Sequence, residues 1–157
     1  MTAPLEIRDA QPADARAIAD LLVSAFEEFE PQYTSAAYAA TILSVDIVRD
    51  RIGWHAVLIA TDEETIAGTV TLQIKDDGAH IRSMAVLPSY RGRGVARTLL
   101  AEVERRAKNQ GFSLVKLSTT PFLEDALRLY RSYGYEDRAE GKRDMFGTPL
   151  VPLQKRL

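Results

Sequence analysis

Arg91-Gly92-Arg93-Gly94-Val95-Ala96 is a glycine-rich turn between a short apolar strand and an amphipathic helix, and this junction decides the fold. The strand is predicted over Ile81-Arg82-Ser83-Met84-Ala85-Val86-Leu87 and ends at Pro88. The helix is predicted from Val95 to Gln110, because apolar residues recur there at helical spacing. A chain with this order places the turn at the end of a strand and at the positive end of a helix dipole.

The turn has the chemistry of a phosphate site. The first turn of a helix leaves several backbone N–H groups unpaired, and glycines let a ligand approach them closely. Arg91 and Arg93 add positive charge. No Gly-Lys-Ser/Thr follows, which excludes a P-loop, and the glycine spacing does not fit the dinucleotide fingerprint. By itself the turn could equally be a solvated basic loop.

Two motifs together resemble a known family. Arg-x-x-Gly-x-Ala after Met-Ala-Val-x-Pro resembles the acyl-CoA-binding motif of the GNAT superfamily of N-acetyltransferases. Leu129-Tyr130-Arg131-Ser132-Tyr133-Gly134-Tyr135 is similar to a second segment of that family. One predicted helix and one predicted strand separate the motifs, as the resemblance requires.

The order of predicted elements fits the same fold. Helices are expected from about Ala15, with Asp14 as a cap, and from about Ser35 to Arg49. The element order is β-α-α-β-β-β-α-β-α-β-β, an α/β (α+β) fold. The resemblance implies a mixed, mostly antiparallel sheet of about 6–7 strands with helices on both faces. We expect one domain over residues 1–157. The further predicted elements are strands at Leu5–Arg8, His55–Ala60, Ile66–Lys75, Phe112–Ser118, from Tyr135 and at Leu150–Leu157, and a helix at Leu123–Tyr133.

Composition narrows the function classes. The 157 residues carry a formal net charge of −2, which argues against a nucleic-acid partner. Cysteine is absent, which excludes disulfides and thiolate chemistry. The chain has only 2 histidines, far apart in sequence, and no metal centre is predicted. Met1 to Arg8 lacks the features of a secretory leader, and no apolar run is long enough to cross a membrane. We therefore expect a cytoplasmic protein with no membrane partner.

The resemblance implies acetyl-CoA as co-substrate and places its site. The pyrophosphate would lie on the backbone amides of Gly92 through Arg97. The pantetheine arm would pair with the backbone in a gap between two diverging strands, and a free N–H near Ala85 or Val86 would bind the developing oxyanion. The expected cofactor-binding residues are Met84, Ala85, Val86, Arg91, Gly92, Arg93, Gly94, Val95, Ala96 and Arg97.

Tyr130 is the expected catalytic residue, because it matches the tyrosine that protonates the coenzyme A sulfur in many family members. The helical spacing of Ala126, Leu129, Tyr130 and Tyr133 also fits a plain core aromatic. The general base is left open. Ser118, Arg82 and Leu123 stand where relatives carry glutamate or asparagine. The candidates that remain are His80, Glu27, Glu28, Glu30 or a chain of water molecules.

The resemblance implies direct transfer of an acetyl group to a primary amine in a ternary complex, without an acyl-cysteine. The acceptor amine is not identified. Acceptor choice is expected to lie with Phe26 to Tyr33, where three carboxylates among aromatics would suit a cationic amine or simply form a solvated helix end. The alternatives are a catalytically silent acyl-CoA-binding module and an RNA-contacting loop. A homodimer could form through the late strands.

Overall fold

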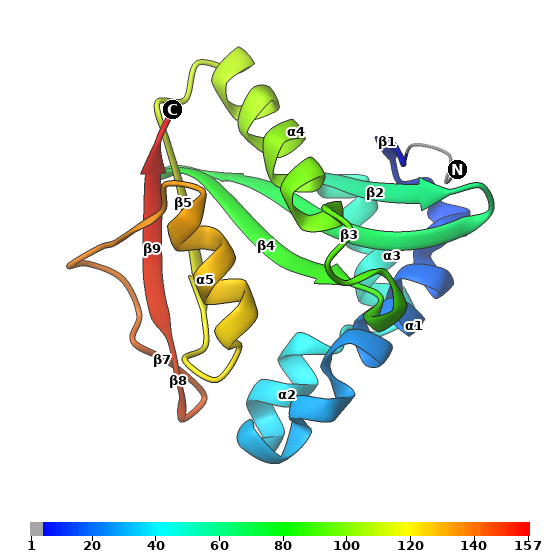
Figure 1. Cartoon of the computed structure of the whole chain (residues 1–157), viewed down its shortest axis with the longest axis horizontal. Coiled ribbons are helices and arrows are strands. Elements are labelled where there is room, and N and C mark those ends of the chain that lie inside the picture. Colours follow the sequence, from blue (N-terminus) through cyan, green and yellow to red (C-terminus); the bar gives the residue numbers. More distant parts are fainter. Residues whose placement is uncertain (1–4) are drawn as a thin grey trace.

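The central sheet is the frame of the molecule, and a computed structural model describes it over residues 5–157. Residues 1–4 of the segment examined for a leader lie outside the described residues. The sheet has seven strands in the order β1-β2-β3-β4-β5-β9-β6, and only the pair β4–β5 is parallel (Figure 1). This confirms the mixed, mostly antiparallel sheet. Its strands are β1 (Glu6–Asp9), β2 (Ala56–Asp62), β3 (Thr65–Lys75), β4 (Gly78–Val86), β5 (Leu114–Thr119), β6 (Glu136–Asp137) and β9 (Val151–Arg156).

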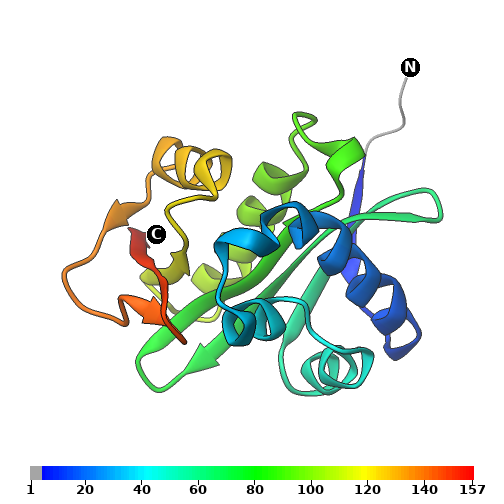
Figure 2. The same cartoon turned by 90° about the horizontal axis from the view of Figure 1, so that it is seen from below.

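Helices cover both faces of the sheet (Figure 2). One face carries α1 (Ala15–Phe26), α2 (Ser35–Thr41) and α3 (Val45–Trp54), with short 3₁₀ turns η1 (Pro12–Asp14) and η2 (Glu27–Gln32) beside α1. The other face carries α4 (Val95–Asn109) and α5 (Glu124–Ser132). A turn η3 (Pro88–Tyr90) leads into the glycine-rich loop, and a small hairpin of β7 (Asp144–Met145) and β8 (Thr148–Pro149) precedes β9.

The sheet separates two cores, because successive side chains of a strand point to opposite faces. Leu58 belongs to the core on the side of α4 and α5, whereas its neighbour Ile59 belongs to the core on the side of α1 and α3. The uninterrupted apolar run of β2 is therefore a strand buried on both faces. Among residues 5–157, no helix is long and apolar enough to cross a bilayer.

The predicted helix from Ser35 to Arg49 is wrong, because the chain forms two helices there. Thr34 caps α2 by accepting a hydrogen bond from the Ala37 N–H, and Ser44 caps α3 by accepting one from the Ile47 N–H. Each cap satisfies an orphan donor and fixes a new helix start. The apolar period runs on through the break, which is why the pattern alone suggested one helix.

Asp14 stands at the N-cap position of α1, as predicted, but its side chain makes no capping hydrogen bond to that helix. Its carboxylate accepts the Gln11 N–H at 2.7 Å and pairs with Arg8 at 2.8 Å, so it stabilises η1 and β1 instead of α1. The residues Asp76-Asp77-Gly78, whose types are typical of a hairpin turn, join β3 to β4 in a hairpin that pairs Lys75 with Gly78.

Candidate active site

The parallel strands β4 and β5 meet at one end of the sheet and then diverge (Figure 1). Their register contains only the pairs Ala79–Val115 and His80–Lys116. Beyond these pairs, the backbone of β4 from Ile81 onward has no strand partner on the β5 side. A cleft of about 1850 Å³ opens between the strands, and residues of both strands line it. The splay that the family resemblance implies is therefore present.

A bulge bends β4 at the mouth of this cleft. Thr69 of β3 pairs with Ala85 and Thr71 pairs with Arg82, so β4 carries one extra residue between these pairs. Ser83 accommodates it in the left-handed region at φ 51°. A bulge interrupts the ladder and leaves backbone groups unpaired. Here it does so next to Met84, Ala85 and Val86, the predicted backbone partners of a pantetheine arm, and all three line the cleft.

The glycine-rich loop closes one end of the cleft. Gly92 and Gly94 have φ values of 75° and 79°, and a side chain at either position would point into open space. The first helical hydrogen bond of α4 runs from the Thr98 N–H to the Gly94 carbonyl at 3.0 Å. The N–H groups of Val95 to Arg97 precede it, and no side chain caps the helix. These open amides and the helix dipole suit an anion.

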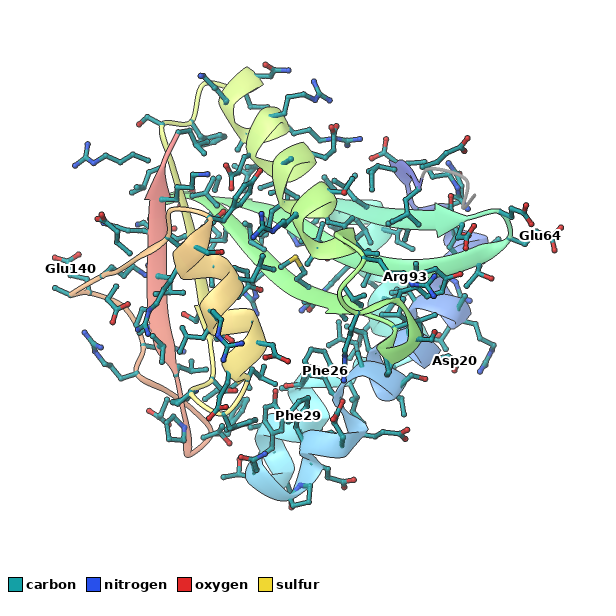
Figure 3. The ribbon with its side chains drawn as sticks, viewed as in Figure 1. Asp20, Phe26, Phe29, Glu64, Arg93 and Glu140 are labelled. Carbon is teal, nitrogen blue, oxygen red and sulfur yellow. The ribbon has the colours of Figure 1, made fainter. Side chains whose placement is uncertain are left out.

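The arginines of the loop differ in where their side chains lie. Arg91 pairs with Glu28 at 2.6 Å and donates to the Ala25 carbonyl at 3.1 Å, which ties the loop to the end of α1. Arg93 lies over the Tyr90 ring at 4.9 Å, and it does not line the cleft. Figure 3 shows Arg93 on the loop, with Phe26 and Phe29 below it at the end of α1 and in η2. Arg97 is the arginine of α4 that lines the cleft.

Tyr130 belongs both to the core and to the cleft. It is 6% exposed, its ring meets that of Tyr135 edge-on at 5.8 Å, and it lines the cleft from α5. Its burial fits a core aromatic, and its place on the cleft is compatible with the catalytic role, which stays a prediction. Burial raises the pKa of its hydroxyl well above the ordinary value of 10.0. Tyr130 thus stays protonated at neutral pH, the form in which it can give up a proton.

The candidate bases are not equally placed. His80 and Glu28 line the cleft, whereas Glu27 and Glu30 do not. Glu28 is engaged by Arg91. His80 Nε2 lies 2.8 Å from the Asp77 carboxylate, and burial, the largest effect, lowers the pKa of His80 below 6.5. Among residues 5–157, no group of three or more histidine, cysteine or acidic side chains is arranged to hold a metal ion.

One side of the cleft, the predicted acceptor side, contains Phe29 and Tyr33 of the segment Phe26 to Tyr33, together with Arg51 and Phe122, which the sequence did not single out. Arg51 reaches in from α3 and donates to the Ser83 hydroxyl at 2.7 Å. Phe29, Tyr33 and Phe122 form an aromatic wall, with Tyr33 and Phe122 ring centroids 4.8 Å apart. These residues come from three distant segments, and no local spacing marks them as neighbours.

Known proteins share these features. Residues 15–135 match the model of the acetyltransferase (GNAT) family. The N-acetyltransferase YjgM of Escherichia coli (strain K12) is 36% identical over 62 residues, which make up 40% of this chain and 37% of that protein. The IAA acetyltransferase of Azospirillum brasilense is 31% identical over 83 residues, or 52% of this chain and 54% of that protein. The matched stretches thus span about half or less of these relatives.

Solved structures have the same fold over almost the whole chain. The PaiA N-acetyltransferase of Thermoplasma acidophilum, in complex with coenzyme A, superposes with a TM-score of 0.85 at 18% identity, covering 99% of this chain and 100% of that one. The ribosomal-protein-alanine N-acetyltransferase of Brucella melitensis superposes with a TM-score of 0.73 at 25% identity, covering 98% of this chain and 100% of that one.

Proposed function

The chain belongs to the acetyltransferase (GNAT) family, and from this membership we propose that it moves an acetyl group from acetyl-CoA to a primary amine by direct transfer in a ternary complex. One observation carries the proposal. The diverging strands β4 and β5, the open amides at the start of α4 and the Tyr130 side chain all border one cleft. We also propose that the whole chain forms a single transferase domain.

The residues of the cleft fit coenzyme A. Open glycines and unpaired amides from Gly92 to Arg97 suit its pyrophosphate, and Arg97 adds a positive charge. The backbone of Met84 to Val86 has no strand partner on the β5 side, and this open side suits the amide groups of the pantetheine arm. Arg91 contributes chiefly by fixing the loop, since its guanidinium is held by Glu28 and Ala25. When bound, acetyl-CoA supplies the thioester carbonyl that the amine attacks.

Two groups of this chain, a backbone N–H and the Tyr130 hydroxyl, would act on the acetyl group and on the leaving sulfur. A backbone N–H at Ala85 or Val86 stabilises the negative charge that develops on the acetyl oxygen. As the new carbon–nitrogen bond forms and the carbon–sulfur bond breaks, Tyr130 donates its proton to the departing sulfur. The chain has no cysteine, so no acyl-cysteine intermediate can form, and the acetyl group passes directly to the amine.

We propose His80 as the group that takes up the amine proton, through water. The Asp77 carboxylate beside Nε2 favours a proton on that nitrogen, which leaves Nδ1 as the basic atom. Because its pKa is lowered, the imidazole is neutral at pH 7 and ready to accept a proton. Protonated amines have a pKa near ~10, so a base is needed at neutral pH.

Calorimetry with acetyl-CoA, followed by a thiol-release assay on a panel of amines, tests the proposal. We expect binding, and release of coenzyme A only when an amine is present. Tight binding with no turnover on small amines, peptides or proteins would instead favour the silent acyl-CoA-binding module. Absence of binding would overturn both.

A further inference from the structure

The acceptor side of the cleft has a cationic wall without matching carboxylates. Arg51 of α3 and Arg82 of β4 both line the cleft. The guanidinium of Arg51 donates to the Ser83 hydroxyl, and that of Arg82 donates to the Gln73 side-chain oxygen at 3.1 Å. Within residues 5–157, neither of the two forms an ion pair with an acidic side chain. Arg91, by contrast, also lines the cleft but pairs with Glu28.

The charge of Arg82 acts on Arg51, and both arginines act on their neighbour His55. Burial and then the charge of Arg82 lower the pKa of Arg51, and burial followed by Arg51 and Arg82 lowers the pKa of His55. A partly buried cation near a like charge is costly unless something compensates it. A bound anion would supply that compensation, and arginine pairs of this kind suit the two oxygens of a carboxylate.

The position of the two arginines on β4 and α3 indicates how far a bound carboxylate would lie from the acceptor amine. Arg82 and Ser83 directly precede Met84, where the predicted backbone contacts to the pantetheine arm begin. The carboxylate would therefore lie close to the nitrogen that receives the acetyl group. Amine and carboxylate groups this close in one molecule are those of an α-amino acid. A polyamine would bring further positive charge to a wall that is already cationic.

The aromatic wall of Phe29, Tyr33 and Phe122, which also lines the cleft, indicates the side chain of the acceptor. Phe29 and Phe122 have ring centroids 6.3 Å apart, and Tyr33 meets Phe122 nearly at a right angle. Such a surface favours an aromatic or large apolar group. Resting on the proposed acetyltransferase activity, we propose that the acceptor is a free α-amino acid with an aromatic or large apolar side chain, its carboxylate bound by Arg51 and Arg82.

Matched acceptors test the role of the carboxylate. L-Phenylalanine, phenylalaninamide and 2-phenylethylamine share the ring and the amine, and only the first carries the carboxylate. We expect kcat/KM for L-phenylalanine to exceed that for 2-phenylethylamine at least about tenfold, as for the loss of one charge-assisted contact. Equal or better use of carboxylate-free amines, peptides or polyamines would overturn the inference and leave the acetyltransferase activity standing.

Variants assign the preference to the two arginines. Arg82→Gln, at an exposed position, should lose most of the preference for L-phenylalanine, with the loss appearing in KM and not in kcat. Arg51→Gln should act in the same direction, with Arg51→Lys as a milder variant should the first lose stability. Arg49→Gln is the control, because Arg49 lies on the same helix, pairs with Asp46 and does not line the cleft. An unchanged preference in Arg82→Gln and Arg51→Lys would contradict the assignment.

Binding separates this inference from the proposed function. Calorimetry should show that L-phenylalanine binds more tightly than 2-phenylethylamine, and that Arg82→Gln removes the difference. That result with no acetylation of any amine would reject the proposed function and retain the carboxylate site. No difference in binding or in turnover would reject the site.

Discussion

Tyr130 combines two roles that usually compete, since its ring fills the core while its residue borders the cleft. Burial keeps the phenol protonated but also makes the hydroxyl a weaker acid than in water. Proton donation to the sulfur is therefore favourable only as negative charge collects there. The proposed role therefore predicts that Tyr130 stabilises the transition state and contributes little to binding of the ground state.

Tyr130→Phe keeps the ring and removes the proton. We expect kcat to fall about 10²-fold or more, because general acid catalysis is lost. The Kd for acetyl-CoA, measured by calorimetry, should change less than about threefold. Tyr133→Phe, three residues along the same helix, is the control; an equal loss in both variants would mean that packing, not proton transfer, is responsible.

Gly94 is the residue on which the shape of the phosphate loop depends. Its φ of 79° is unfavourable for any residue with a side chain, although there is room for one. Gly94→Ala should cost about 1 kcal/mol of stability and weaken acetyl-CoA binding, as calorimetry and thermal unfolding can show. Gly53→Ala is the matched control, because Gly53 also faces open space but lies inside α3 without a positive φ. That change should leave binding intact and stabilise the protein slightly.

His80 should give the reaction an acid limb. Burial lowers the pKa of His80 below 6.5. The neutral imidazole, which accepts a proton, therefore predominates at every pH above this lowered pKa. The profile of kcat/KM should therefore rise with pH through that value and level off before pH 7. His80→Gln should remove the limb and lower the plateau, while Glu28→Gln keeps the limb. An unaltered limb in His80→Gln would exclude His80 as the base.

At the scale of elements, the packing of α4 on β3 sets the position of the phosphate loop. A Cβ at Gly68 would lie 2.8 Å from the Val95 Cγ1 and 3.1 Å from the Ala85 carbonyl oxygen. The first residue of α4 can approach the sheet only because position 68 has no side chain. The loop and the cleft strand are thus brought together by one close contact.

Gly68→Ala should force α4 away from the sheet. We expect a loss of about 1–3 kcal/mol in stability, typical of overpacking, together with weaker acetyl-CoA binding. Denaturant unfolding and calorimetry measure the two effects. Adding Val95→Ala should restore part of both, and purely additive effects in the double variant would show that the contact with Val95 is not the cause.

Elements were predictable where their signals are local. The hairpin at Asp77-Gly78 and the helix ended by Gly111 follow from turn residues and from a left-handed glycine, which has φ 92°. The break between α2 and α3 was not predicted. The apolar period is continuous there, but the Thr34 cap and the Ser44 cap each begin a separate helix. The bulge at Ser83 has no sequence signal, since serine is an ordinary strand residue and only the register with β3 displays the extra residue.

The site was predictable in part for the same reason. Gly92, Gly94 and Tyr130 stand in contiguous motifs, and the structure brings them to one cleft. Arg51 and Phe122 are far from those motifs in sequence, and only the folded sheet places them there. Whether the late strands pair between two copies stays a prediction, which light scattering in solution can test.

At the scale of the whole molecule, the sheet is nearly divided where β4 and β5 diverge. Glu104 of α4 spans the division by pairing with Lys155 of β9 at 2.7 Å and accepting from the Tyr135 hydroxyl at 3.0 Å. These charged side chains are only 13% and 22% exposed. The ammonium of Lys155 also lies 4.2 Å from the Tyr133 ring centroid.

Lys155→Met should leave Glu104 without its cation. We expect a loss of about 1–3 kcal/mol, the cost of a mostly buried polar group without its partner, measured by thermal unfolding. Lys142→Met, on the exposed stretch before β7, is the control and should stay within about 0.5 kcal/mol. Equal stability of Lys155→Met and the wild type would show that this ion pair does not hold the two parts of the sheet together.

The single parallel pairing also bears on the order in which the chain folds. The hairpins of β2, β3 and β4 join neighbours in sequence, so they can close early and at low entropic cost. The contact of Ala79 with Val115 must wait until α4 has crossed over the sheet. We therefore expect the two walls of the cleft, β4 and β5, to form at different stages of folding. A ligand bound in the cleft would then stabilise the pairing that forms last.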